Sequence, residues 1–207
     1  MVVGDEGASP PGARERRRRR TTRDLARAAV ALFEEKGFEA TTVEEIAEAA
    51  DYSARTFFRI FARKEDCVFF DLEARLDAAS VKVADATIAA EWSVLRAALL
   101  DHARSWEGGD PEFARARARL FHREPALTAR YLAHSLRWEE DLVQRILQRG
   151  GDRQDRAAVY LAASVVVAAY RTAFRVQVEE GGALVDLLDD ALARVEQSGF
   201  IASQFRE

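Results

Sequence analysis

The stretch from Thr41 to Lys64 constrains the fold of this chain more than any other part of the sequence. Thr42 and Glu45 have the Thr-x-x-Glu spacing of a capping box, which predicts a helix that starts directly after Thr42. The helical pattern then breaks, because Asp51 suits a left-handed turn and Ser53 suits the N-cap of a second helix. The second helix would be apolar on one side and basic on the other. Two short helices around such a turn are typical of a helix-turn-helix unit, whose second helix enters the major groove of DNA.

A longer amphipathic helix is expected just before this stretch. Thr21 or Thr22 would cap it, and apolar residues recur along one face as far as Phe33. Gly37 would end it at the position where helices commonly end in glycine. Together with the next two helices it would form a small three-helix module over residues 21–66.

The first 20 residues differ in composition from the rest of the chain. Residues 1–13 are rich in glycine, proline, serine and alanine, and residues 14–20 read RERRRRR. We therefore expect a disordered basic arm over residues 1–20. Such an arm can simply remain in solvent. Its place directly before a helix-turn-helix unit favours instead an arm that neutralises phosphates or reaches into a minor groove.

The remainder of the chain, residues 67–207, is also expected to be helical. Residues 64–86 have the pattern of one long helix, which would join the three-helix module to the rest. Further helices are predicted at about residues 91–107, 111–124, 125–150, 153–180 and 183–199. No segment alternates polar and apolar residues between turn signals, so the expected fold class is all-α.

Two of these helices favour association with a second chain. Residues 157–170 are apolar on every side, and a helix of that kind must be buried on every side. Residues 184–195 carry a stripe of leucine, alanine and valine. The pair could pack with the same pair of a second copy as a four-helix bundle. One monomeric core is the alternative, but a dimer presents two DNA-reading helices to two half-sites, so we expect a homodimer.

The composition argues against several classes of protein. No apolar run reaches the ~18 residues of a membrane span, and no signal peptide is evident, so we expect no membrane association. One cysteine rules out an internal disulfide framework and suits the cytoplasm. The net charge of −4 argues against indiscriminate binding of nucleic acid, and the basic excess lies near the N-terminus.

An enzyme is not expected. His102, His122 and His134 fall on different predicted helices and lack the spacing of metal ligands. The sequence has no glycine-rich phosphate loop, no nucleophile elbow and no zinc-protease motif. We therefore expect no catalytic residue, no cofactor and no metal site.

Several features of residues 21–69 occur together in one known family. They are the A-x-x-L-F-x-x-x-G-F run from Ala29 to Phe38, Thr41-Thr42, Ile46-Ala47, and the block Ser53-x-x-Thr56-Phe57-Phe58-x-x-Phe61-x-x-Lys64-Glu65. This combination resembles the N-terminal DNA-binding domain of TetR-family transcriptional regulators. The resemblance implies an all-α homodimer, with a helix-turn-helix domain over residues 21–66. A divergent helical domain for ligand binding and dimerisation would follow over residues 67–207.

The C-terminal half carries a second resemblance. The segment ALTARYLAHSLRWEEDLVQRILQRGG is followed by a helix rich in alanine and valine and by one rich in leucine and aspartate. This order is similar to regulators of the mycofactocin-regulator type, which are associated with acyl-CoA-like ligands. The resemblance therefore implies a small-molecule effector that is either apolar or acyl-CoA-like.

The first resemblance assigns roles to residues that would contact DNA. They are Thr42, Ser53, Ala54, Arg55, Thr56, Phe58, Arg59 and Lys64. Thr42, Arg59 and Lys64 would contact phosphates, and Arg55 would grip a guanine with two hydrogen bonds. Phe58 stands where the family usually has tyrosine and would contact a thymine methyl group or a sugar.

Aromatic and arginine side chains in the C-terminal half are candidates for ligand binding. They are Trp106, Phe113, Arg117, Phe121, Trp138, Tyr170, Arg171 and Phe174. Aromatic residues at helical spacing often form only a core, but ligand pockets are also largely apolar with a few polar groups. Arg171 follows an apolar helix, and its guanidinium, if buried, would need a carboxylate or a phosphate as partner. We expect that partner to be a protein carboxylate rather than a ligand.

These observations lead to one hypothesis and two alternatives. The hypothesis is a repressor that binds a palindromic double-stranded DNA operator as a homodimer and is released by a small apolar or acyl-CoA-like effector. One alternative is a constitutive DNA-binding protein without an effector. The other is an acyl-CoA-binding protein or enzyme whose helix-turn-helix is vestigial.

Overall fold

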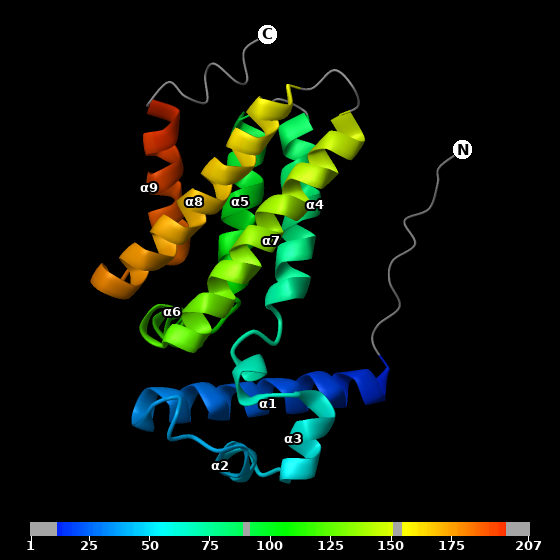
Figure 1. The fold of residues 1–207 in the computed structure, drawn as a ribbon, viewed down its shortest axis with the longest axis vertical. Helices are drawn as coiled ribbons and strands as arrows, with labels where there is room; N and C mark the ends of the chain where they lie inside the picture. The colour runs from blue at the N-terminus through cyan, green and yellow to red at the C-terminus, as the bar shows by residue number, and fades with distance from the viewer. Residues whose placement is uncertain (1–11, 89–91, 151–154, 198–207) are drawn as a thin grey trace. The chain divides into compact units, whose positions relative to one another are not determined.

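The computed structural model describes residues 12–88, 92–150 and 155–197. Within these ranges it contains nine α-helices, one short 3₁₀ helix and no strand, so the predicted all-α fold class is confirmed. The chain divides into two compact units, residues 1–70 and 71–207 (Figure 1).

The first unit is the predicted three-helix module with a short addition. Its elements are α1 (Ala13–Lys36), α2 (Val43–Ala49), α3 (Ala54–Ile60) and the 3₁₀ helix η1 (Lys64–Cys67). α1 contacts α2 and η1, and α2 contacts α3. Leu25, Phe33, Ile46 and Phe57 are fully buried where these elements meet. Burial of these four side chains is what holds the short α2 and α3 in place.

The prediction of a disordered arm is wrong for residues 13–20, which form the start of α1. The Arg19 side chain donates to Glu15 one turn away, at 2.9 Å, and the Thr21 hydroxyl donates to the Arg17 carbonyl at 3.1 Å. A helix that is already anchored by packing can be extended without the cost of a new nucleus. The rest of the predicted arm, residues 1–11, lies outside the described residues.

The single long helix expected over residues 64–86 is also wrong, because η1 and α4 are separate elements. Cys67, Val68 and Phe69 are consecutive and all buried, which one face of an α-helix cannot achieve at 3.6 residues per turn. The Asp66 carboxylate accepts the Arg63 backbone N–H at 2.9 Å and fixes the start of η1. The two units therefore divide after Phe70, rather than after residue 66 as predicted.

The second unit contains the remaining six helices. They are α4 (Leu72–Ile88), α5 (Trp92–Glu107), α6 (Pro111–Arg123), α7 (Pro125–Gly150), α8 (Arg156–Glu180) and α9 (Leu184–Gln197). α4 lies against α5 and α7, and α8 contacts α6, α7 and α9 (Figure 1). Helices α5 to α9 occur where the sequence predicts them.

α8 is apolar enough to need an explanation. By length and composition alone it could cross a membrane, with a mean hydropathy of 1.5 over its most apolar window. Its contacts with α6, α7 and α9 account for part of that composition, since 44% of this window is buried inside the domain. Near its start, however, Tyr160 and Leu161 are 48% and 43% exposed within one chain. The expected burial on every side is therefore not reached in the monomer.

Candidate DNA-reading head and ligand cavity

α3 is fixed in orientation by a polar cap at its start and by an aromatic anchor on its inner side. The Ser53 hydroxyl oxygen accepts the Thr56 backbone N–H at 3.2 Å, and the two side-chain hydroxyls lie 3.1 Å apart. Phe57 is fully buried, with its ring 5.5 Å from that of Phe61. These contacts set which side of α3 faces outward.

The outward side of α3 carries the side chains predicted to read DNA. Arg55, Phe58 and Arg59 are exposed there, and Ala54 is half-buried at the start of the helix. Phe58 is 57% exposed, which is unusual for a ring of that size. The structure thus brings these candidates together on one accessible face.

The turn between α2 and α3 is anchored on α1. Asp51 has a φ of 57° and is the one non-glycine residue with positive φ within the described ranges, as its predicted left-handed turn requires. The Tyr52 backbone N–H donates to the Ala47 carbonyl at 2.8 Å, and the Tyr52 hydroxyl donates to Asp24 of α1 at 3.1 Å. The prediction for Asp51 is confirmed, and the turn cannot move independently of α1.

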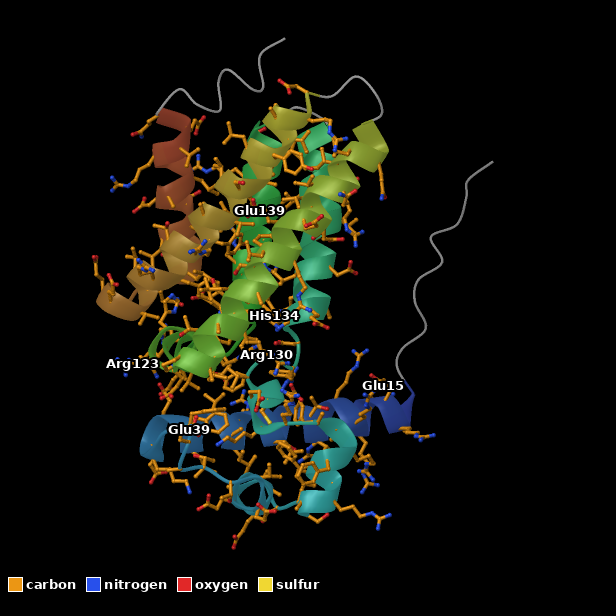
Figure 2. All side chains as sticks on the ribbon, viewed as in Figure 1. Glu15, Glu39, Arg123, Arg130, His134 and Glu139 are labelled. Atoms are coloured by element: carbon orange, nitrogen blue, oxygen red, sulfur yellow. The ribbon has the colours of Figure 1, made fainter. Side chains whose placement is uncertain are left out.

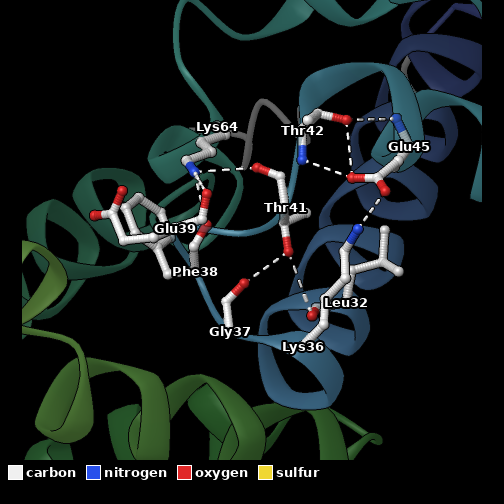
Figure 3. A network of polar contacts seen from close by, with 9 residues as sticks. All are labelled: Leu32, Lys36, Gly37, Phe38, Glu39, Thr41, Thr42, Glu45 and Lys64. Carbon is white, nitrogen blue, oxygen red and sulfur yellow. Dashed lines mark hydrogen bonds and ion pairs between the residues drawn. The ribbon is translucent and has the colours of Figure 1, made fainter.

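The loop between α1 and α2 is held by a lysine (Figure 3). The Lys64 ammonium donates to the carbonyls of Phe38 at 2.6 Å, Glu39 at 3.4 Å and Thr41 at 3.0 Å. It also lies 4.3 Å from the centroid of the Phe38 ring. The Thr41 hydroxyl donates to the Gly37 carbonyl at 2.8 Å, which closes the loop from inside.

These contacts correct the role predicted for Lys64. An ammonium group has three N–H donors, and all three are directed at main-chain carbonyls of the loop. Sequence spacing could not show this, because the acceptors lie 23 to 26 residues away. Lys64 therefore holds the loop that precedes α2 and does not present its donors to a phosphate.

Thr42 forms the predicted capping box with Glu45 (Figure 3). Its backbone N–H and its hydroxyl each donate to the Glu45 carboxylate at 2.8 Å. A hydrogen bond from Lys36, together with these two from Thr42, lowers the pKa of Glu45 to about 2. The phosphate contact predicted for Thr42 would require its hydroxyl to leave this carboxylate.

We expect Lys64→Met to destabilise the protein by about 1–3 kcal/mol, because the aliphatic stem remains while three carbonyls lose their donor. Urea unfolding measures the change. Arg63→Met is the matched control, since the Arg63 side chain is 76% exposed and its substitution should change stability by no more than about 0.5 kcal/mol. Equal stability of Lys64→Met and wild type would contradict the assigned role.

The second unit contains a partly open cavity between α4, α5, α6, α7 and α8, whose enclosed space is only about 30 Å³; the empty space is about 470 Å³ when the open solvent at its mouth is included. Its lining residues are Leu72, Leu76, His102, Trp106, Phe121, Tyr131, His134, Ser135, Trp138, Val167, Tyr170, Arg171 and Phe174. Six of the eight predicted ligand-binding residues are among them. The remaining two, Phe113 and Arg117, are not.

The aromatic rings of the lining pack closely against one another. Phe121 stacks on Tyr131 with centroids 5.1 Å apart, and Trp106 meets Phe174 edge-on at 5.3 Å. Rings at these separations are in contact, so the space between them is narrow. A ligand of more than a few atoms would have to part the rings.

Arg117 stands behind the cavity wall, which corrects its predicted role. The side chain is 2% exposed, and it donates to the Asp71 carboxylate at 2.7 Å. Its guanidinium lies 4.3 Å from the Trp106 ring centroid and 5.6 Å from that of Phe113. Burial alone would raise the pKa of Asp71, but Arg117 and Arg75 hold that pKa below its ordinary value. Arg117 is thus a paired structural charge that supports Trp106.

Arg171 lies at the edge of the cavity and is exposed, so the prediction of a buried guanidinium paired with a protein carboxylate is wrong. No ion pair to it forms among the residues that the structure describes. Tyr170 and Phe174, one turn apart on α8, point inward and leave Arg171 at the rim.

Sequence reasoning missed seven lining residues: Leu72, Leu76, His102, Tyr131, His134, Ser135 and Val167. Helical spacing could have identified two of them. His102 precedes Trp106 by four residues, and Tyr131 precedes Trp138 by seven, so each pair shares a helix face. Which helices meet around the cavity, in contrast, is set by long-range packing.

The two histidines of the lining are held neutral. Burial lowers the pKa of His102 to about 4, and the nearby charge of Arg75 adds to this effect. Burial, and then the charge of Arg137, lowers the pKa of His134, which is on α7 (Figure 2). In the described parts of the chain no group of three His, Cys, Asp or Glu side chains could hold a metal ion.

A more open groove of about 500 Å³ adjoins the cavity between α4 and α7. The two share the lining residues Leu76, His134 and Trp138. The groove also contains the carboxylates of Glu73, Asp77 and Asp141 and the guanidinium of Arg137. Arg145 forms ion pairs with Asp77 and Asp141. The groove therefore has no excess of positive charge.

Comparison with known proteins identifies the family. Residues 22–69 match the family described as "Bacterial regulatory proteins, tetR family", and residues 89–199 match the "MftR C-terminal domain". The chain belongs to the TetR family. Both resemblances drawn from the sequence are confirmed at this level, and the family consists of transcriptional regulators rather than enzymes.

Two curated relatives are similar over much of the chain. The HTH-type transcriptional regulator TcmR of Streptomyces glaucescens is 40% identical over 147 residues, which cover 68% of this chain and 65% of TcmR. The match thus spans just under two thirds of that relative. MftR of Mycobacterium tuberculosis (strain ATCC 25618 / H37Rv), named for the regulation of mycofactocin biosynthesis, is 28% identical over 192 residues, or 88% of this chain and 96% of MftR.

Among solved structures, the TetR family transcriptional regulator PfmR from Thermus thermophilus is 22% identical. The alignment covers 82% of this chain and 97% of PfmR, with a TM-score of 0.47.

We expect acid to destabilise the protein through His102. The folded-state pKa of about 4 lies below the ordinary value of 6.5, so the unfolded chain binds more protons between these pH values. Stability contributed by the neutral ring is complete above pH 6.5 and is lost as pH falls through this window. The loss at pH 5 should be about 2 kcal/mol.

Urea unfolding of wild type and His102→Phe at pH 7.5 and pH 5 measures this loss of stability on acidification. The variant keeps an apolar ring but cannot titrate, so it should lose less stability on acidification by that amount. The same loss in both proteins would show that His102 does not titrate as described.

Proposed function

We propose that this TetR-family regulator is a repressor that binds a palindromic DNA operator as a homodimer and is released by a small effector. The observation that carries the proposal is the outward face of α3, where Arg55, Phe58 and Arg59 are exposed above the buried Phe57. A helix capped and anchored in this way presents a fixed set of side chains to a groove. The protein would act in the cytoplasm, where the DNA is.

Each exposed side chain of α3 would make a different kind of contact. Arg55 near the start of the helix can donate two hydrogen bonds to a guanine edge. Arg59, one turn further on, would pair with a phosphate. Phe58 would bury its exposed ring against a thymine methyl group or a sugar.

The arginines of α1 would add contacts that are independent of sequence. In helical form, residues 14–20 are a rigid cationic rod with Arg19 and Arg20 side chains 69% and 83% exposed. Charges spaced along a helix can follow a phosphate backbone at a lower entropic cost than a disordered arm. This proposal replaces the disordered arm expected from the sequence.

Dimerisation through α8 and α9 is supported by the apolar surface that one chain leaves uncovered. Tyr160 and Leu161 of α8 are the exposed apolar residues near its start. A second copy placed on a twofold axis would cover them and present two α3 helices to two half-sites.

The effector would occupy the cavity of the second unit, and its lining favours a small apolar molecule over an acyl-CoA. The adjoining groove sets the carboxylates of Glu73, Asp77 and Asp141 against Arg137 and Arg145. That balance leaves no surplus of positive charge for the phosphates of a CoA thioester. Arg171 at the cavity edge is the one observation that favours an anionic group.

Release would follow from a shift between two conformations. An effector lowers affinity for DNA only if it binds more tightly to a conformation that fits the operator badly. Leu72 and Leu76 of α4 line the cavity, and Leu72 is the second residue after Phe70, where the first unit ends. Movement of the first turn of α4 would therefore act directly on the connection between the units.

Arg55→Ala should weaken operator binding by about 1–3 kcal/mol and leave binding to random DNA almost unchanged. Fluorescence anisotropy with a selected operator and with a scrambled duplex measures both affinities. Arg59→Ala is the control, since loss of a phosphate contact should weaken both duplexes alike. An equal loss on both duplexes for Arg55→Ala would remove its proposed role in reading bases.

Replacement of Arg16 to Arg20 by glutamine should weaken binding to every sequence and reduce the slope of log K against log salt. Replacement of the same five residues by lysine keeps the charge and should keep most of the slope. A glutamine variant with the wild-type slope would mean that α1 makes no phosphate contact.

A further inference from the structure

Two hydrogen-bond donors in the lining of the cavity have no acceptor. The indole Nε1 atoms of Trp106 and Trp138 are buried and form no hydrogen bond within the part of the chain that the structure describes. The two residues are only 4% and 5% exposed, and both line the cavity. Buried donors are nearly always paired in folded proteins, so two orphans in one cavity call for an explanation.

Other polar groups of the same lining do have partners. The Tyr170 hydroxyl donates to the Leu99 carbonyl, and the Ser135 hydroxyl donates to the Tyr131 carbonyl at 3.0 Å. His134 Nδ1 lies 2.9 Å from the guanidinium of Arg137. Among the fully buried polar side-chain atoms of this lining, only the two indole nitrogens lack a partner in the described part of the chain.

Both indoles are held in place by packing. Arg117, fixed by Asp71, lies over the face of Trp106, and Phe174 meets that ring edge-on. Trp138 lies edge-on to Tyr170 at 5.3 Å, and its ring centroid is 6.1 Å from that of His102. Neither ring can turn to find an acceptor elsewhere without breaking these contacts.

The surroundings of the indoles are unsuited to a buried charge. The lining contains no carboxylate, and its one arginine, Arg171, is at the exposed edge. Both histidines are neutral near pH 7, as described above. An ionised group placed deep in this cavity would lose its hydration without gaining a partner.

We propose that the effector is an uncharged, ring-containing molecule whose carbonyl oxygens accept hydrogen bonds from the Trp106 and Trp138 indoles. Such a ring would lie between the aromatic side chains, and its oxygens would satisfy the two donors. This inference rests on the proposed function, because it takes the cavity to be the effector site.

The test uses two probes with one ring system, 9-fluorenone and fluorene, which differ by a carbonyl oxygen. Wild type should bind 9-fluorenone about tenfold more tightly than fluorene, a difference typical of one hydrogen bond. In ¹H–¹⁵N spectra, an indole proton of Trp106 or Trp138 should shift downfield with 9-fluorenone only. Spectra of Trp106→Phe and Trp138→Phe assign the two indole peaks among the three tryptophans of the chain.

Trp106→Phe and Trp138→Phe keep an aromatic ring and remove the donor. At least one of them should lower affinity for 9-fluorenone and leave affinity for fluorene unchanged. The inference is overturned if wild type binds both probes equally or neither, or if each variant weakens both probes alike. It is also overturned if the two indole peaks do not move on addition of 9-fluorenone.

Val167→Trp separates this inference from the proposed function. The larger side chain fills the cavity, so the variant should bind neither probe. If it binds both as wild type does, the probes do not occupy the cavity and the inference is overturned. If decanoyl-CoA releases wild type from DNA and 9-fluorenone does not, the inference fails while the regulator function stands.

Discussion

The ion pair between Arg117 and Asp71 is the interaction on which the second unit most depends. A guanidinium that is 2% exposed cannot remain charged without a partner, so Asp71 must stay beside α6. Asp71 is also the first residue of the second unit and directly precedes α4. On its other side, Arg117 supports the Trp106 ring. This one ion pair therefore links the start of α4, the position of α6 and one wall of the cavity.

The first unit is small, and polar contacts hold it where its core is thin. The Lys64 ammonium donates to three carbonyls of the loop before α2. At the start of that helix, the Glu45 carboxylate accepts a hydrogen bond from Thr42 and pairs with Lys36. These side chains stabilise the fold with polar groups that could otherwise have contacted DNA. The outward face of α3 does not hold the fold together, because the residue that anchors the helix, Phe57, points inward. The residues on this face can therefore be those that bind a particular operator, without loss of stability.

Sequence reasoning succeeded where neighbours in the chain decide the structure. The capping box of Thr42 and Glu45, the turn at Asp51 and the cap at Ser53 each depend on a few adjacent residues, and all three were predicted. It failed where the partner is distant. The Lys64 acceptors lie 23 or more residues away and Asp71 lies 46 residues from Arg117, so no local pattern reveals either role. The helical start of α1 was not predicted for a related reason: it is stabilised as an extension of the part of the same helix that packs in the core.

The cavity shows what helical spacing can and cannot determine. Spacing identified five aromatic lining residues, since an aromatic residue on an inward face repeats every three or four positions. It could not show that two indole donors are left without acceptors, which depends on how five helices meet. The rings of Trp106 and Trp138 both pack on rings of α8, so a ligand that reaches those donors must move α8 away from α5 and α7. α4 lies against both α5 and α7, and its start is tied to α6 through Asp71. Binding of an effector between these rings would therefore disturb the two helices against which α4 packs.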